Sequence, residues 1–170
     1  MKKAFAVLTA LFVIFTAGGI AEAKKFPGFS TKDLDGKTIT NAVFAENEIT
    51  MINFWATWCP PCIAEMPDLA KLDDALEDTD GEGGLIGILI DADDRGAIRK
   101  AEQILDKADA YFPQLRPSKE MKSILDSIDA IPTSIFVDSE GNIVGPTIVG
   151  SRSMREYLAA MATALKEARK

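Results

Sequence analysis

A pair of cysteines stands where a strand is expected to run into a helix, and this junction constrains the fold more than any other feature of the chain. Residues 49–55 are rich in strand-forming side chains. Cys59 and Cys62 follow, separated by two prolines, and beyond them apolar residues recur at helical spacing. Prolines fit the first turn of a helix, because the N–H groups there have no partner within the helix. The sequence therefore predicts that both cysteines lie at the start of a helix that follows a strand.

The next strand indicates how these elements are arranged in the sheet. The helix, in which Pro67 is expected to produce a kink, ends in the acidic segment 73–84. Residues 85–90 then form a nearly continuous apolar run, as in a buried parallel strand. A strand, a helix and a second strand within about 40 residues form a right-handed crossover, in which the two strands are parallel. The sheet is therefore expected to have parallel strands at its centre.

The other segments complete a single α/β domain over residues 24–170. A short hairpin is expected within residues 26–40, where an Asp-Gly dipeptide favours a tight turn. The segments 133–138 and 143–149 flank a turn and should pair as antiparallel strands at one side of the sheet. Helices are expected at residues 95–107, 119–128 and 153–168. The fold class that follows is α/β, with a central mixed sheet flanked by helices and an N-terminal β-hairpin.

The first 23 residues have the pattern of an export signal. Two lysines precede an apolar run, residues 4–20, and the sequence Ala-Glu-Ala ends at Ala23. This order is typical of a secretory signal peptide, residues 1–23, that is cleaved after Ala23. The run is also near the minimum length that spans a bilayer, so an uncleaved anchor formed by residues 4–20 is the alternative. In either case we expect residues 24–170 in the bacterial periplasm, where cysteines meet an oxidising environment.

Composition removes several classes of function. The chain contains no histidine, which excludes general bases, catalytic triads and metal sites that depend on imidazole. Its net charge of −7 gives no electrostatic reason to bind nucleic acid or an anionic membrane surface. A partial match to a calcium loop begins at Asp91, but Arg95 occupies a ligand position, and capping of the next helix by Asp93 or Asp94 explains the same residues. Proteins or small molecules are therefore the expected partners.

The position of the two cysteines gives each a separate chemical role. The N-terminus of a helix favours an anion, so it should lower the pKa of the Cys59 thiol and make Cys59 the attacking sulfur. Cys62 lies almost one turn further on, close enough to form a disulfide with Cys59 and to resolve a mixed disulfide between Cys59 and a substrate. A purely structural disulfide and half of a metal site shared with a second chain are the alternatives. We favour a redox couple.

The stretch around the cysteines resembles the active site of the exported thioredoxin-like proteins of the TlpA/ResA type. The resemblance is carried by residues 54–62 with 65–67, residues 26–29 with 33–37, and residues 131–134 with 138–141. It implies the thioredoxin fold and a cis peptide bond between Ile131 and Pro132 that faces the cysteines. A cis bond before proline leaves backbone groups free to pair with an extended substrate segment. The residues then expected to contact the substrate are Trp58, Pro60, Ile131 and Pro132.

The resemblance also gives Glu65 a role beside the two sulfurs. Glu65 matches an acidic position of the family that lies near both cysteines, and a carboxylate there would exchange a proton with Cys62 as the disulfide forms and breaks. An exposed helix glutamate is the alternative. Asn53 stands where cytoplasmic thioredoxins have a buried aspartate, which strengthens the case for Glu65 as the proton carrier. Trp55 is expected in the core.

The function that the resemblance implies is that of a thiol-disulfide oxidoreductase. Such a protein would reduce disulfides in exported proteins, for example during cytochrome c maturation, and would take electrons from a membrane donor of the thiol-disulfide relay type. No bound cofactor is needed, because the two cysteines carry the electrons. A binding module with an idle disulfide is an alternative from another class. A peroxide-reducing enzyme of related fold is a third, but the Pro-x-x-x-Thr-x-x-Cys run expected around its cysteine is absent from the sequence.

Overall fold

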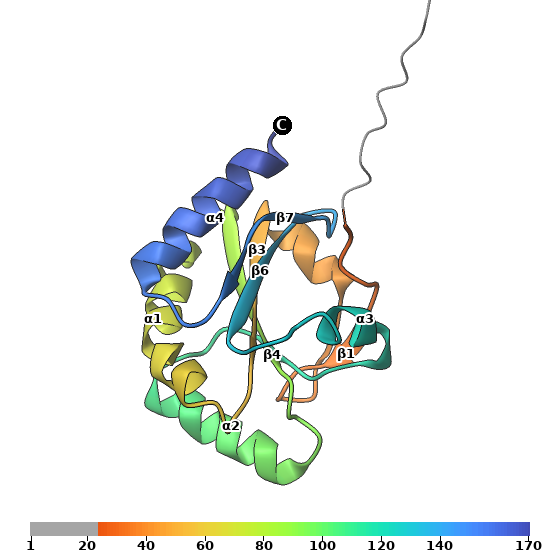
Figure 1. The fold of residues 1–170 in the computed structure, drawn as a ribbon, viewed down its shortest axis with the longest axis vertical. Helices are drawn as coiled ribbons and strands as arrows, with labels where there is room; N and C mark the ends of the chain where they lie inside the picture. The colour runs from red at the N-terminus through yellow and green to blue at the C-terminus, as the bar shows by residue number, and fades with distance from the viewer. Residues whose placement is uncertain (1–23) are drawn as a thin grey trace, which may run out of the picture.

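A five-stranded mixed sheet, in the order β5-β4-β3-β6-β7, forms the centre of the computed structural model, which describes residues 24–170 (Figure 1). The central strand β3 (Ile49–Trp55) pairs parallel with β4 (Gly83–Leu89) and antiparallel with β6 (Thr133–Asp138). The short strand β5 (Gln114–Leu115) extends the parallel side, and β7 (Ile143–Val149) extends the antiparallel side. The carboxyl end of β3 therefore lies in the middle of the sheet, between strands of both directions.

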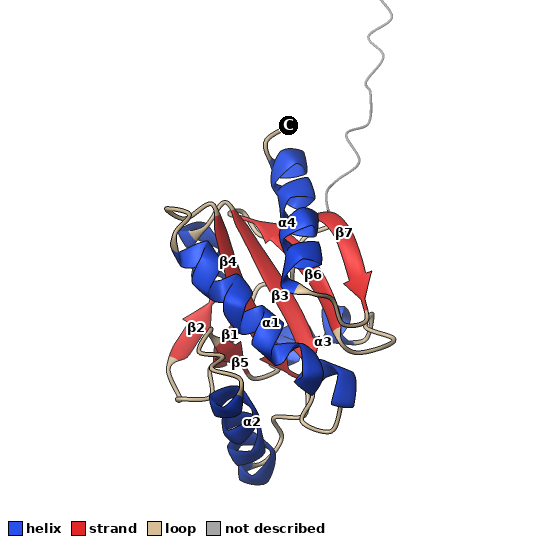
Figure 2. Cartoon of the chain, turned by 90° about the vertical axis from the view of Figure 1, so that its left-hand side faces the viewer, coloured by secondary structure: helices blue, strands red, loops and turns tan. Residues whose placement is uncertain are grey.

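Helices cover both faces of this sheet. α1 (Pro60–Glu77) and α4 (Met154–Ala168) lie side by side on one face, as Figure 2 shows. α2 (Arg95–Lys107) contributes Ala101 and Leu105 to the hydrophobic cluster beneath them. The short elements are η1 (Asn41–Glu46), η2 (Lys119–Met121) and α3 (Lys122–Leu125), which supply buried side chains to the opposite face.

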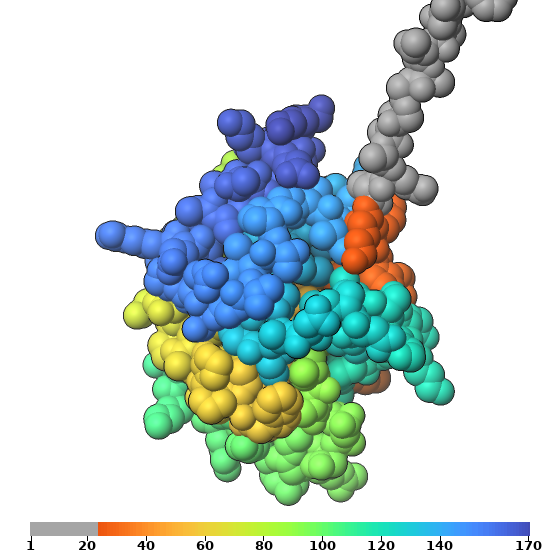
Figure 3. Space-filling view, in the orientation of Figure 1, coloured from red at the N-terminus to blue at the C-terminus, as the bar shows by residue number. Residues whose placement is uncertain are grey.

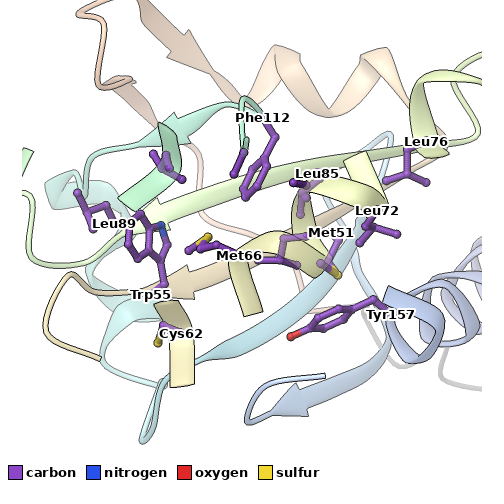
Figure 4. Packing of buried hydrophobic residues seen from close by; sticks show 14 of the residues in the cluster. Met51, Trp55, Cys62, Met66, Leu72, Leu76, Leu85, Leu89, Phe112 and Tyr157 are labelled. Atoms are coloured by element: carbon purple, nitrogen blue, oxygen red, sulfur yellow. The ribbon is translucent and has the colours of Figure 1, made fainter. Parts of the chain in front are cut away.

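The alternation of side chains along β3 divides the core into two clusters. Met51 and Trp55 belong to the cluster under α1 and α4 (Figure 4), whereas Ile52 and Phe54 belong to the cluster on the other face. All seven residues of β3 are buried, since the strand is covered on both sides. Burial on both faces explains why β3 is apolar almost throughout and does not alternate between apolar and polar residues. The end of β3, where the redox loop begins, is therefore shielded from water.

An N-terminal hairpin precedes this sheet, as the sequence predicts. β1 (Ser30–Lys32) and β2 (Thr38–Thr40) pair antiparallel, and Gly36 in the turn between them has a φ of 87°, which glycine adopts readily. The first described residues lie against the β6–β7 turn, where Lys25 bridges to Asn142 (Figure 3). The predicted signal segment, residues 1–23, lies outside the described residues.

Most of the predicted elements are confirmed with their limits. The strands at 49–55, 133–138 and 143–149 and the helix at 95–107 begin and end as predicted, and Asp94 caps that helix with its carboxylate 2.9 Å from the Ala97 nitrogen. The expected helix at 119–128 is wrong in its extent, because it divides into η2 and α3 and continues only as tight turns. The Ser127 hydroxyl donates to the Ile124 carbonyl there and competes with regular helix bonding.

The acidic segment at the end of α1 contains one carboxylate that is not fully solvated. Asp73 is half-buried and lines a surface hollow together with Glu77. Burial, and then the negative charges of Glu77 and Asp74, raise the pKa of Asp73 from 3.8 to about 6. Between these two pH values the folded chain holds a proton that the unfolded chain has lost. The free energy of unfolding should therefore decrease as the pH rises through this window.

Replacing Asp73 by asparagine should remove this effect. We expect Asp73→Asn to raise the free energy of unfolding at pH 7 by about 1 kcal/mol, a value that allows for screening by solvent, and to leave it nearly unchanged near pH 3.5. Urea unfolding of both proteins at the two pH values measures the difference. The exposed neighbour Asp74 is the control, and Asp74→Asn should give a smaller gain. An equal effect of Asp73→Asn at both pH values would contradict the assignment.

Candidate active site

The two cysteines form a disulfide at the N-terminus of α1. Cys59 is the N-cap residue of this helix, and its sulfur accepts a hydrogen bond from the backbone N–H of Cys62 at 3.3 Å. Cys59 is 3% exposed, whereas Cys62 is fully buried. Unpaired N–H groups and the helix dipole favour a negative charge at this place, so the structure supports the thiolate on Cys59. The less buried of the two cysteines is thus also the one at the helix end.

The rim around Cys59 brings together the four residues expected to meet a substrate. Trp58 is 63% exposed, and Pro60 is exposed beside it. The peptide bond between Ile131 and Pro132 is cis, as the resemblance implies, and the Ile131 carbonyl oxygen lies 3.7 Å from the Cys59 sulfur. A backbone oxygen next to the attacking sulfur is available to pair with an extended chain.

A carboxylate from the neighbouring strand holds the loop that leads to Cys59. Asp91, just beyond β4, accepts hydrogen bonds from the Thr57 N–H at 3.2 Å and from the Thr57 hydroxyl at 2.7 Å. Sequence reasoning placed Asp91 only in a rejected calcium pattern and missed this contact. The signal that could have found it is an acid at the carboxyl end of a parallel strand, next to the end of β3.

Trp55 is in the core, as predicted, and a glutamine fixes its ring. The Trp55 Nε1 donates to the Gln114 Oε1 at 2.8 Å, and both side chains are buried. Gly87 makes room for this contact, because a Cβ there would lie 2.0 Å from the Gln114 Oε1. The indole beside the redox loop therefore has its only donor satisfied.

Glu65 lies inside the protein, on the same face of α1 as Cys62 and one turn after it. It is only 2% exposed, so the alternative of an exposed helix glutamate is wrong. The Tyr157 hydroxyl donates to Glu65 Oε2 at 2.7 Å, and Asn53 Nδ2 donates to Glu65 Oε1 at 3.0 Å. The Asn53 amide also donates to the Ser134 hydroxyl oxygen at 3.1 Å. Three elements, α1, α4 and β3, thus meet at one buried carboxylate, and β6 is joined to them through Asn53.

Two opposing effects act on the acidity of this carboxylate. Burial raises the pKa of Glu65, and this is the larger effect. Hydrogen bonds from Tyr157 and Asn53, together with Arg152, lower the same pKa because they stabilise the ionised form. A buried carboxyl group with a raised pKa, one helical turn from Cys62, has the properties of a group that can take up and return a proton.

Within residues 24–170, no group of three or more acidic or cysteine side chains has the arrangement to hold a metal ion. None of the helices in the same part of the chain is long and apolar enough to cross a membrane. Asp94, from the partial calcium pattern, caps α2.

Fold and site together define the class of the protein: it is a thioredoxin-like thiol-disulfide oxidoreductase. The model of the AhpC/TSA family matches residues 23–145, and the chain belongs to this family.

Known proteins of similar sequence and structure carry names of the same class. The chain is 31% identical over 134 residues to the thiol-disulfide oxidoreductase ResA of Bacillus cereus, which covers 78% of this chain and 72% of that protein. It is 29% identical over 138 residues to the thioredoxin-like protein YneN of Bacillus subtilis, with 81% and 77% covered. A thiol:disulfide interchange protein of the thioredoxin family from Chlorobium tepidum has a similar structure, with a TM-score of 0.70, 27% identity, and 85% and 98% of the two chains covered. The resemblance to proteins of the ResA type is confirmed.

Proposed function

We propose that the protein works in the periplasm and reduces disulfides of exported proteins, with apocytochrome c as one substrate. The observation that carries the proposal is the place of the Cys59 sulfur, at the start of α1 and 3.7 Å from the Ile131 carbonyl oxygen. A sulfur held there can ionise and can meet a disulfide in a chain that pairs with the cis-proline loop. The export pattern of residues 1–23 supports the compartment.

The proposed reaction follows from the place of each cysteine, because Cys59 is the N-cap of α1 and Cys62 is fully buried one turn further on. The Cys59 thiolate attacks the substrate disulfide, whose other sulfur leaves and takes up a proton from solvent. Cys62 then loses its proton, attacks Cys59, and releases the second substrate sulfur, which is protonated in turn. Two electrons have passed to the substrate, and the Cys59–Cys62 disulfide is the product. We propose that a membrane protein of the thiol-disulfide relay type reduces this disulfide again.

Glu65 has the position needed to accept the proton of Cys62 in the second step. It is buried one turn from Cys62, where water has little access, and its raised pKa makes the transfer less uphill than to an ordinary carboxylate. Glu65 then returns the proton as the substrate thiolate leaves. The four rim residues, Trp58, Pro60, Ile131 and Pro132, would hold the substrate chain during both steps.

Replacing Glu65 by glutamine should slow the second step and leave the first nearly unchanged. Glutamine keeps the size of the side chain but cannot accept a proton, so we expect resolution of the mixed disulfide to slow about tenfold to a hundredfold at pH 7. Stopped-flow measurement of release from a mixed disulfide at Cys59 gives this rate. Glu102→Gln, at an exposed position of α2, is the control and should change nothing. Unchanged resolution in Glu65→Gln would exclude the proton role.

Trapping tests the function as a whole. A Cys62→Ser protein can form a mixed disulfide but cannot resolve it, so it should accumulate covalent adducts with exported proteins that dithiothreitol releases. A variant with both cysteines replaced should form none. If both variants instead hold the same partners without a covalent bond, the chain is a binding module with an idle disulfide. Consumption of peroxide by the reduced wild-type protein at the rate of disulfide reduction would favour a peroxidase.

A further inference from the structure

The hydroxyl group of Tyr157 is the least expected member of the polar cluster around Glu65. Tyr157 comes from α4, near the C-terminus, and is fully buried among apolar side chains of the cluster under α1 and α4. Figure 4 shows its ring reaching from α4 with the hydroxyl turned toward the side of the core where Cys62 lies. A buried tyrosine needs a partner for its hydroxyl, and the partner here is the Glu65 carboxylate.

The two donors to Glu65 come from different sides and occupy different oxygens. Asn53 holds Oε1 and Tyr157 holds Oε2, so the plane of the carboxyl group is fixed. A carboxylate held at one oxygen alone can turn about its terminal bond, which is a soft torsion. Loss of the Tyr157 hydroxyl would therefore leave Asn53, from β3, as the remaining side-chain donor, beside the backbone of Arg152 in the loop.

On its surface side, Glu65 lines a hollow into which its carboxylate could turn. A hollow of about 250 Å³ between α1 and the loop that precedes α4 is lined by the residues Ala64, Glu65, Asp68, Ser151, Arg152, Ser153 and Glu156. The Arg152 guanidinium donates to the carbonyl oxygens of Gly150 and Ser151, which keeps its positive charge in this loop. Without the Tyr157 hydroxyl, a carboxylate could turn from its interior partners toward this charge and toward water.

We propose that Tyr157 is a positioning residue of the redox site: its hydroxyl holds the Glu65 carboxylate in the interior, on the side of Cys62, and keeps it from turning into the surface hollow. The inference rests on the proposed role of Glu65 as the proton carrier. It assigns to the C-terminal helix a function in the chemistry, through a contact that spans 92 positions of the chain.

The charges around Glu65 are consistent with this role. Cys62 lies one turn before Glu65 on the same face of α1, and Arg152, Asp68 and Glu156 line the hollow together with Glu65. Burial raises the pKa of Tyr157, and the negative charge of Glu65 raises it further, so the hydroxyl keeps its proton at neutral pH and remains a donor. Tyr157 therefore does not itself act as a base at the pH at which the site works.

The direct test is a titration of Glu65 in Tyr157→Phe. The phenyl ring keeps the packing, and only the hydrogen bond to the ionised carboxylate is lost. The carboxylate should then turn into the hollow, where relief of its burial and the charge of Arg152 outweigh the lost hydrogen bond, because burial is the largest influence on this pKa. We expect the pKa of Glu65, followed by its carboxyl carbon in NMR spectra of the oxidised protein, to fall by about one unit, or tenfold in the ionisation constant. Tyr111→Phe makes the same chemical change at a side chain that is 75% exposed, and should leave the pKa of Glu65 unchanged. An unchanged pKa in Tyr157→Phe would overturn the proposal.

The unmodified protein gives a second test that does not depend on the folding of a variant. If the hydroxyl of Tyr157 donates to Glu65, the ring carbon that bears the hydroxyl should shift with the same apparent pKa as the Glu65 carboxyl carbon. If the chemical shift of this ring carbon does not change as Glu65 titrates, the contact between Tyr157 and Glu65 is contradicted. Both NMR experiments use the oxidised chain, so their outcome does not depend on whether the proposed reaction is correct.

A kinetic measurement connects the contact to the reaction. Because resolution of the mixed disulfide needs the ionised form of Glu65, its pH profile in Tyr157→Phe should move to lower pH by the same amount as the pKa of Glu65, while the attack of Cys59 keeps its own profile. The rate on the plateau of that profile should also fall, because the carboxylate has turned away from the side of Cys62. If Glu65 titrates differently in Tyr157→Phe and the resolution profile stays where it is, Tyr157 does not act on the reaction through Glu65. A merely structural role would lower both rates without moving either profile.

Discussion

Cys59→Ser is expected to lose disulfide-reductase turnover by about a thousandfold or more. The serine hydroxyl is not ionised at neutral pH, and it forms neither a mixed disulfide nor a disulfide with Cys62. The N-cap position would be preserved, because serine is itself a good N-cap and can accept the Cys62 N–H. The fold should therefore survive while the chemistry is lost. Reduction of a peptide disulfide, coupled to a dithiol donor, measures the turnover.

The matched variant for this experiment is Cys62→Ser. It retains the attacking sulfur, so it should react once with the substrate and then stop at the mixed disulfide. The two variants remove the same disulfide and one sulfur each, and they differ only in which sulfur remains. Full reductase activity in Cys59→Ser would refute the assignment of the nucleophile. A single burst in both variants would show that the two sulfurs are interchangeable.

Gly145→Ala should destabilise the fold by about 3 kcal/mol. Gly145 lies in β7 with a φ of 68°, and a Cβ there would lie 2.6 Å from the Cβ and 2.8 Å from the Cα of Ala164 in α4. A methyl group cannot fit without moving the helix backbone. The cost combines the left-handed backbone, about 1 kcal/mol, with the overpacking of β7 against α4, about 2 kcal/mol. Urea unfolding at neutral pH gives the change.

Gly36→Ala separates the two contributions. Gly36 also has a positive φ, 87°, but a Cβ there has nothing within 4 Å, so only the backbone cost of about 1 kcal/mol should appear. Equal losses in the two variants would mean that β7 and α4 are not in close contact at Gly145. Because α4 also carries Tyr157, a shifted helix in Gly145→Ala should lower the pKa of Glu65, as Tyr157→Phe does.

The sequence was sufficient to predict the strands and helices whose apolar residues recur at a regular spacing. The buried run of β3 and the hairpin β6–β7 were predicted with their limits, and the helix that starts at the prolines was predicted without an exact end, because apolar spacing and turn residues act locally. β5 could not be predicted, since two residues carry no period. α3 was overestimated because the chain from 119 to 128 has helical residue types, but a serine hydroxyl and tight turns end the helix early.

The site was predictable to a lesser degree, and for a physical reason. Cys59 and Cys62 were predictable because their close spacing at a strand–helix junction is visible in the sequence. The cis bond before Pro132, in contrast, was expected only from the resemblance. The contacts of Asp91 with Thr57 and of Tyr157 with Glu65 join segments that are 34 and 92 positions apart. Such pairs are set by the packing of whole elements, and no local pattern reports them.

The central claim is that Cys59 ionises first and is the accessible sulfur. The measurement that tests it most directly is the rate of alkylation of each thiol in the reduced protein as a function of pH, with the modified cysteine identified by peptide mass. The account predicts that Cys59 reacts at least tenfold faster than Cys62 at pH 7, with a pKa below that of an ordinary thiol. Equal and slow alkylation of both thiols, each with an ordinary or raised pKa, would contradict it.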